Sequence, residues 1–287
     1  MAHLQTWIRV VLDAASEGQV ELPAFPTVAI RLVELLENDD PSLKDVERLI
    51  AQDPVLTERV LRIANSVMYA RQMPADTLAQ ALVRLGLRET AQVAMASAAS
   101  VLFNAESRAE LAEYPELWHS LWFDSLVSAY GARLLSQELK VAVPEHAFLG
   151  AMFRNLGGVV ILKVVSQALV AGSVETRPDE DALRFVFSQV AGVLGADYLA
   201  RSRMPAYVVA VARHYGDPAA AEEAGDALHV VRLAAGLCEK LGIAPFSKSE
   251  LGELALGSVA ELGVEPEKLD LFELQFKELA EQVAGLA

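Results

Sequence analysis

The sequence is poor in cysteine and in positive charge. A single cysteine, Cys238, stands among 287 residues, so no disulfide can form within the chain, and a reducing cytoplasm is the expected compartment. Lysine and arginine together number 24, against 39 aspartate and glutamate residues, which gives a formal net charge of -15. This charge argues against broad electrostatic capture of nucleic acid or of an anionic membrane, because both attract basic proteins.

Long hydrophobic runs are also lacking. No uninterrupted apolar stretch reaches the roughly 20 residues that a membrane-spanning helix needs. The N-terminus has no basic region followed by a signal-type apolar core. Hydrophobic residues nevertheless make up 53% of the chain, which excludes a disordered or collagen-like protein. We therefore expect a soluble, cytoplasmic protein with a sizeable core and no membrane segment.

The pattern of apolar residues predicts an all-α fold. Apolar positions recur at helical spacing nearly everywhere, and no segment alternates with the two-residue period of a strand. Residue pairs typical of helix starts support this prediction: Ser42 with Asp45, Asp53 before Pro54, and Thr77 with Gln80. We expect several short helices first and longer helices after them.

A polar stretch near the middle of the chain predicts the domain organisation. Residues 104–115 are polar, and we place a subdomain boundary there. Residues 1–112 would form an N-terminal helical bundle, packed on a second helical subdomain that covers residues 113–287. One long buried helix of the second subdomain is predicted over about 145–169.

Three sequence elements, in order, carry a family resemblance. They are LPAFPTVAIRLVELL from Leu22, DDPSLKDVERLIAQDPVLTERVLRIANS from Asp39, and ALVRLGLRET from Ala81. Together they resemble the opening of an HDOD domain, a bacterial signalling relative of the HD-superfamily metal-dependent phosphohydrolases. The resemblance covers roughly residues 20–240 and implies a multi-helical, HD-like fold.

The resemblance also indicates where a hydrolase of the HD superfamily would bind its metal. Such enzymes use a histidine on one helix, a His-Asp pair on a second helix, and a late aspartate. These positions correspond here to His119, to Arg154-Asn155 and to the neighbourhood of Ala235, while His214 matches a histidine often present in the superfamily. Only His119 keeps a ligand type, and arginine has no lone pair to donate. We therefore predict a degenerate HD site without metal, cofactor or metal-dependent hydrolysis.

Two interpretations of Arg154 remain open. The resemblance would gather a cationic pocket for phosphate, carboxylate or nucleotide, because arginine binds such anions through its planar fork. The candidate residues of this pocket are His119, Arg154, Asn155 and His214. Alternatively, Arg154 pairs with an acid such as Asp124 or Glu145 and holds helices in register, because buried charges need partners.

The resemblance implies a regulatory role. Proteins of the HDOD family are generally regarded as non-catalytic output or scaffolding modules. We therefore expect a non-enzymatic signal-transduction module that contacts other signalling proteins and is modulated by a small anionic or nucleotide ligand. A first alternative is a metal-dependent phosphohydrolase with relocated ligands.

A second alternative is a weak nucleic-acid-binding regulator. The short helices predicted over about 42–51 and 54–65 imitate helix-turn-helix spacing. A basic face would come from five arginines: Arg59, Arg62, Arg71, Arg84 and Arg88. Glu58 and the acidic chain as a whole favour a solvated face instead, so nucleic acid is not the expected partner.

Overall fold

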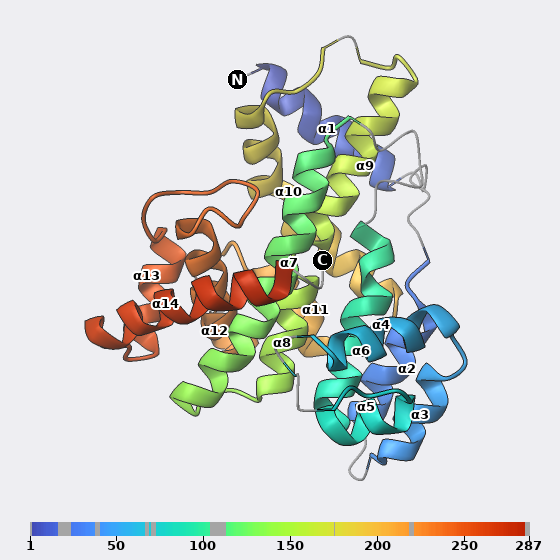
Figure 1. Cartoon of the computed structure of the whole chain (residues 1–287). Coiled ribbons are helices and arrows are strands. Elements are labelled where there is room, and N and C mark those ends of the chain that lie inside the picture. Colours follow the sequence, from blue (N-terminus) through green and yellow to red (C-terminus); the bar gives the residue numbers. More distant parts are fainter. Residues whose placement is uncertain are drawn as a thin grey trace. The chain divides into compact units, whose positions relative to one another are not determined.

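A computed structural model of the chain describes residues 2–16, 24–37, 41–66, 69, 73–103, 113–174, 176–217 and 221–284. Within these residues the secondary structure is helical and contains no strand, which confirms the all-α prediction (Figure 1). The chain divides into two compact units. The larger unit comprises Met1–Leu22, Phe103–Arg201 and Pro205–Glu281, and the smaller unit comprises Pro23–Leu102, Ser202–Met204 and Gln282–Ala287.

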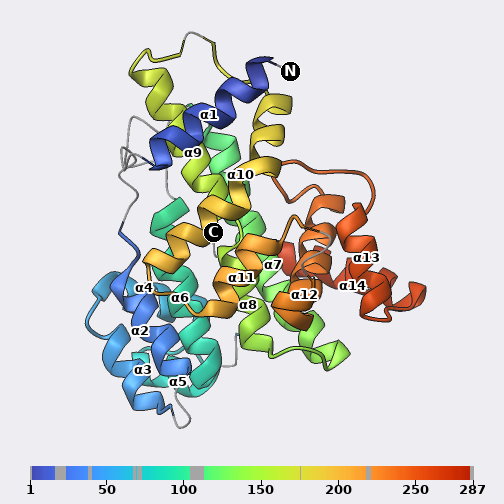
Figure 2. The same ribbon diagram turned by 180° about the vertical axis from the view of Figure 1, so that it is seen from behind.

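The smaller unit consists of short helices whose starts follow local rules. Its helices are α2 (Thr27–Leu36), α3 (Leu43–Ile50), α4 (Pro54–Ala64), α5 (Leu78–Leu85) and most of α6 (Leu87–Phe103) (Figure 2). The Ser42 hydroxyl accepts from the Asp45 N–H, the Asp53 carboxylate caps α4, and Thr77 forms a capping box with Gln80. All three predicted helix starts are confirmed, because each satisfies N–H groups that a helix leaves unpaired.

The predicted basic face of the smaller unit is partly used inside the unit. Arg59 donates to the carbonyl oxygen of Ser97 at 2.8 Å, and Arg84 donates to the carbonyl oxygen of Ala64 at 2.8 Å. Arg71 lies outside the described residues. The bonds of Arg59 and Arg84 join helices within the unit, so these two guanidinium groups have a structural role that needs no nucleic acid.

The larger unit is built around long central helices. Its elements are α1 (Ala2–Ser16), the C-terminal residue of α6, α7 (Pro115–Leu139), α8 (Pro144–Phe153), α9 (Leu156–Val170), α10 (Glu180–Arg201), α11 (Ala206–His214), α12 (Ala221–Lys240), α13 (Glu253–Glu261) and most of α14 (Pro266–Ala284). Helix α7 packs on α8 and α12, and α9 packs on α10. Among described residues, the stretch Pro144–Val170 is long and apolar enough to cross a membrane, but 89% of its most apolar window is buried, as in a core helix.

The first helix belongs to the larger unit, whereas the sequence analysis placed it in the N-terminal subdomain of residues 1–112. Helix α1 contacts α9 and α10, and it lies beside α9 in both views (Figures 1 and 2). Its apolar side chains Trp7 and Val11, one helical turn apart, are fully buried. A boundary drawn from polarity along the chain does not detect such a long-range contact.

Helices α9 and α10 approach each other through glycine. A Cβ atom added to Gly157 would lie 1.8 Å from the carbonyl oxygen of Ala191, and one added to Gly195 would lie 2.9 Å from the backbone nitrogen of Gly157. Since backbone cannot move aside like a flexible side chain, the crossing requires glycine at both positions. This close contact holds the start of α9, where the candidate site lies.

We predict that Gly157→Ala lowers the free energy of unfolding by about 1–3 kcal/mol, because the added methyl group overpacks a backbone contact. Urea denaturation followed by circular dichroism would measure the change. The matched control is Gly257→Ala on α13, where an added Cβ meets nothing within 4 Å. The control should be neutral or slightly stabilising, since alanine favours a helix over glycine. Equal effects at the two positions would contradict the assigned crossing.

Candidate functional site

The candidate site lies where the predicted long helix is interrupted. The sequence analysis expected one helix over 145–169, but α8 ends at Phe153 and α9 begins at Leu156. Arg154 and Asn155 form the turn between them. The Arg154 N–H still bonds the Gly150 carbonyl oxygen at 3.1 Å, so the chain bends without leaving helical dihedral angles. The prediction of one continuous helix was therefore wrong only at its two adjacent polar residues.

Arg154 is held in a buried polar network with α7. Its Nη2 donates to Asp124 Oδ2 at 2.5 Å, and its Nη1 donates to Asn155 Oδ1 at 2.8 Å. The Asn155 amide donates in turn to Asp124 Oδ2 at 2.9 Å and to Ser125 Oγ at 3.0 Å. The side chains of Arg154 and Asp124 are 6% and 1% exposed. These four residues form what we call the Arg154 network, and the interpretation in which Arg154 pairs with Asp124 describes it.

The surroundings of this network fix the protonation states of its side chains and of their neighbours. Burial is the largest influence on the pKa of Arg154 and lowers it, but the Asp124 carboxylate, Tyr215, Cys238 and the hydrogen bond to Asp124 together raise it above the ordinary value. The guanidinium lies 5.0 Å from the centre of the Tyr215 ring, and burial raises the pKa of the Tyr215 hydroxyl. Burial and then the charge of Asp124 raise the pKa of the Cys238 thiol. The thiol therefore stays protonated, in the form that neither binds metal nor attacks a substrate.

The two candidate histidines lie on α7 and at the end of α11. His119 is exposed on α7, with its ring stacked on Phe123 at a centroid distance of 6.2 Å. Five helical residues separate His119 from Asp124, which corresponds to roughly 140° around the helix. His214 ends α11, and its carbonyl oxygen accepts a hydrogen bond from Arg232. Neither histidine lines the cavity beside the Arg154 network, whereas Arg154 and Asn155 both line it.

A cavity of about 480 Å³ adjoins the Arg154 network, entirely within the larger unit. Its walls add cationic and aromatic side chains to Arg154: Arg184, Arg213, Lys248, Phe187, Tyr215 and Phe246. Sequence reasoning missed all six. They come from α10, from the end of α11 and from the loop after α12, so no local pattern in the sequence could have grouped them. We call this space the Arg154 cavity.

Another residue missed from the sequence holds one wall of this cavity. Arg232 is buried and donates to the carbonyl oxygens of His214 at 2.7 Å, of Tyr215 at 3.0 Å and of Asp217. Carbonyl groups at a helix end need such donors, so Arg232 fixes the turn that carries Tyr215. The available signal was a lone arginine in the apolar run VVRLAAGLC.

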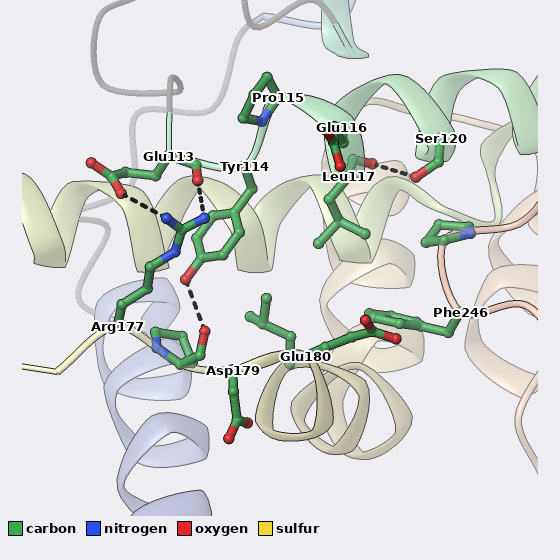
Figure 3. A pocket seen from close by; sticks show the side chains of 13 residues that line it. Glu113, Tyr114, Pro115, Glu116, Leu117, Ser120, Arg177, Asp179, Glu180 and Phe246 are labelled. Atoms are coloured by element: carbon green, nitrogen blue, oxygen red, sulfur yellow. Dashed lines mark hydrogen bonds and ion pairs between the residues drawn. The ribbon is translucent and has the colours of Figure 1, made fainter.

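A second, acidic cavity of about 950 Å³ lies next to the first and shares Pro245 and Phe246 with it. Figure 3 shows Arg177 against the Tyr114 ring, at 4.2 Å, with the Tyr114 hydroxyl donating to the Pro178 carbonyl oxygen at 3.2 Å. Four carboxylates line this second cavity: Glu113, Glu116, Asp179 and Glu180. The two cavities therefore differ in charge although they share a wall.

Comparison with known proteins supports the predicted resemblance. A model of the HDOD domain matches residues 22–218. An HDOD domain protein of unknown function from Geobacter sulfurreducens has a similar crystal structure, with a TM-score of 0.76, 22% identity and 99% of both chains covered. A "putative metal-dependent phosphohydrolase" from Shewanella amazonensis SB2B gives 0.71 at 22% identity, covering 98% of this chain and 99% of that one.

A "putative signal transduction protein" from Marinobacter aquaeolei VT8 gives a TM-score of 0.70 at 22% identity, covering 97% of this chain and 64% of that one. At this identity the solved structures establish a shared fold and nothing finer. Among curated proteins, none matches the sequence.

The residues at the degenerate HD site do not fit a divalent cation. Within the described part of the chain, no group of three or more His, Cys, Asp or Glu side chains could hold a metal ion. Asp124 is the carboxylate at this position, and its Oδ2 already accepts from Arg154 and Asn155. A cation placed there would have to displace a paired guanidinium.

We predict that Arg154→Met lowers the free energy of unfolding by about 3–5 kcal/mol, because it leaves the Asp124 carboxylate buried without its cation. Chemical denaturation would measure this loss. The matched control is Arg213→Met in the same unit, whose pair with Asp197 is exposed and should contribute about 1 kcal/mol or less. Similar losses for both variants would contradict the central role of the buried pair.

Proposed function

The chain belongs to the HDOD domain family, and from that premise we propose that it is a non-catalytic signal-transduction module acting through contacts with other signalling proteins. The observation that carries the proposal is the Arg154–Asp124 pair at the degenerate HD site. Metal-dependent hydrolysis needs a cation that activates water and neutralises phosphate. A guanidinium neutralises phosphate but cannot activate water in this way.

The hydrogen bonds within the Arg154 network favour a regulatory site over a catalytic site. Arg154 and Asn155 bond to each other and both bond to Asp124, so the polar side chains hold each other in one arrangement. A likeness in fold to a protein named for signal transduction agrees with this proposal. The proposal includes a cytoplasmic location, in keeping with the single protonated thiol of Cys238.

The proposal also includes modulation by a small ligand. The Arg154 cavity is the place for it, because it joins the buried network to cationic side chains on three different elements. A ligand bound there would contact α10, the end of α11 and the loop after α12 together. It could thereby shift the balance between two arrangements of these elements, provided that it binds one of them better.

We predict that the purified protein carries no stoichiometric manganese, iron or nickel and does not hydrolyse phosphodiesters when these metals are supplied. The matched variant is Arg154→His with Asn155→Asp, which places two new donors beside Asp124. The variant should bind Mn²⁺ where the natural chain does not, since it supplies a histidine and two carboxylates. Metal analysis and a phosphodiesterase assay on both proteins would check this.

Stoichiometric metal together with turnover in the natural protein would overturn the proposed function and favour the hydrolase alternative. Affinity capture from extracts of the native cell, with metal analysis of the same sample, tests the proposed contacts with other signalling proteins. A specific partner retained at a fixed ratio is the expected result. A protein that turns over a phosphodiester and retains no partner would contradict it.

A further inference from the structure

The Arg154 cavity has the size and composition of a small-molecule site. Its volume of about 480 Å³ falls in the usual range for such sites. Leu121 and Leu254 contribute apolar surface on α7 and α13, while the Arg154 network supplies a polar wall. All of its walls belong to the larger unit, so the cavity does not depend on how the two units are arranged.

The charge of the cavity is opposite to that of the chain. Four cationic side chains line it, Arg154, Arg184, Arg213 and Lys248, against the three carboxylates Asp124, Asp217 and Glu239. The whole protein carries a formal charge of -15. A local excess of positive charge in such a chain favours an anionic occupant, because it concentrates anions against the field of the remaining surface.

Two of the four cations are available for a ligand. Arg184 pairs with Glu180 at 2.8 Å, with side chains 43% and 69% exposed, and Arg213 pairs with Asp197 at 3.2 Å, with side chains 41% and 50% exposed. Exposed pairs of this kind contribute little, so a bound oxyanion can replace these partners. Arg154, by contrast, is committed to Asp124, and Lys248 pairs at 3.2 Å with Glu239, a carboxylate that is only 24% exposed.

Unsatisfied guanidinium nitrogens give independent evidence for a missing partner. The Nε atoms of Arg154 and Arg184 are both buried and have no hydrogen-bond acceptor in the described structure. Both residues line the cavity, and the Arg154 side chain is more than nine-tenths buried. Buried donors without acceptors are rare, and each needs an explanation such as a bound ligand or water.

The aromatic side chains indicate what the anion is attached to. Phe187 and Phe246 meet edge to face at a centroid distance of 5.1 Å, and the Arg184 guanidinium lies 5.5 Å from the centre of the Phe246 ring. Both rings line the cavity and form an apolar wall beside Arg184. A planar ring would gain from packing on that wall, since aromatic pairs contribute beyond the area that they bury.

From these observations we infer that the Arg154 cavity binds a small molecule in which a planar ring carries an oxyanion. The oxyanion lies between Arg184 and Arg213, and the ring packs against Phe187 and Phe246. This inference deepens the proposed function and rests on it. The shared chemistry has two sources in a cell, nucleoside monophosphates and aromatic carboxylates, which the experiment separates.

Isothermal titration calorimetry with AMP, GMP, anthranilate and 4-hydroxybenzoate tests the inference. Inorganic phosphate and adenosine, which are the anionic part and the ring-bearing part of AMP, are titrated separately for comparison. At least one ring-bearing anion should bind about tenfold tighter than either part, because two sets of contacts then act together. The affinity of this anion should fall as the NaCl concentration is raised, because Arg184 and Arg213 are partly exposed to solvent. Binding of nucleotides alone or of carboxylates alone supports the inference and identifies the source.

The variants Arg184→Gln and Arg213→Gln should each weaken binding by about tenfold, as expected when a charge-assisted hydrogen bond is lost. Both arginines pair only at the surface, so the variants should keep the melting temperature of the natural protein. The matched control is Glu116→Gln in the acidic cavity of Figure 3, which should leave binding unchanged.

Three results would overturn the inference: no binding of any ring-bearing anion, equal binding of phosphate alone, or binding that neither arginine variant weakens. These results would leave standing the non-catalytic role and the contacts with other signalling proteins, because partner capture and turnover are measured separately. Metal-dependent turnover of a phosphodiester would instead remove the proposed function itself, whatever the calorimetry shows.

Discussion

The ion pair between Arg154 and Asp124 is the constraint on which the candidate site depends. Two charged side chains, 6% and 1% exposed, are taken from water, which costs several kcal/mol for each ion unless the partners meet with good geometry. The 2.5 Å contact and the bonds of Asn155 to Asp124 and Ser125 supply that geometry. Because the pair is stable only when α7 and the α8–α9 turn are in register, it couples their positions. The same pair occupies the space and the carboxylate oxygen that a metal ion would need.

The network relies in turn on contacts that fix the backbone around it. At the start of α9, Gly157 lies so close to the Ala191 carbonyl group on α10 that no side chain fits between them. After the end of α11, Arg232 donates to three carbonyl oxygens and so holds Tyr215 near the Arg154 guanidinium. Neither Gly157 nor Arg232 carries a charge or a donor into the cavity chemistry. Their effect on the site is positional, through the backbone that they hold.

The outcome of prediction from sequence depended on whether a feature was local. Helix starts at Ser42 and Thr77 were correctly predicted, because a capping side chain bonds within three residues of itself. Asp124 could be named as one possible partner of Arg154, since burial of an arginine requires an acid. His119 was placed in the site although it lies on another face of α7, because a match to a family pattern does not fix the phase of a helix to a single residue. The cavity walls formed by Arg184, Arg213 and Phe246 could not be predicted, since three separate elements bring them together.

Exchange of a metal for a guanidinium separates two tasks that a phosphohydrolase site performs together. A metal ion both neutralises an oxyanion and lowers the pKa of a bound water, whereas arginine, which stays charged, performs only the first task. A cavity that keeps positive charge and loses its metal donors can therefore recognise an anion without cleaving it. On the proposed function, binding is then a signal and not the first step of a reaction. The ligand's effect must come from its different affinity for two arrangements of the walls, and α10, the end of α11 and the loop after α12 are the elements that it would join.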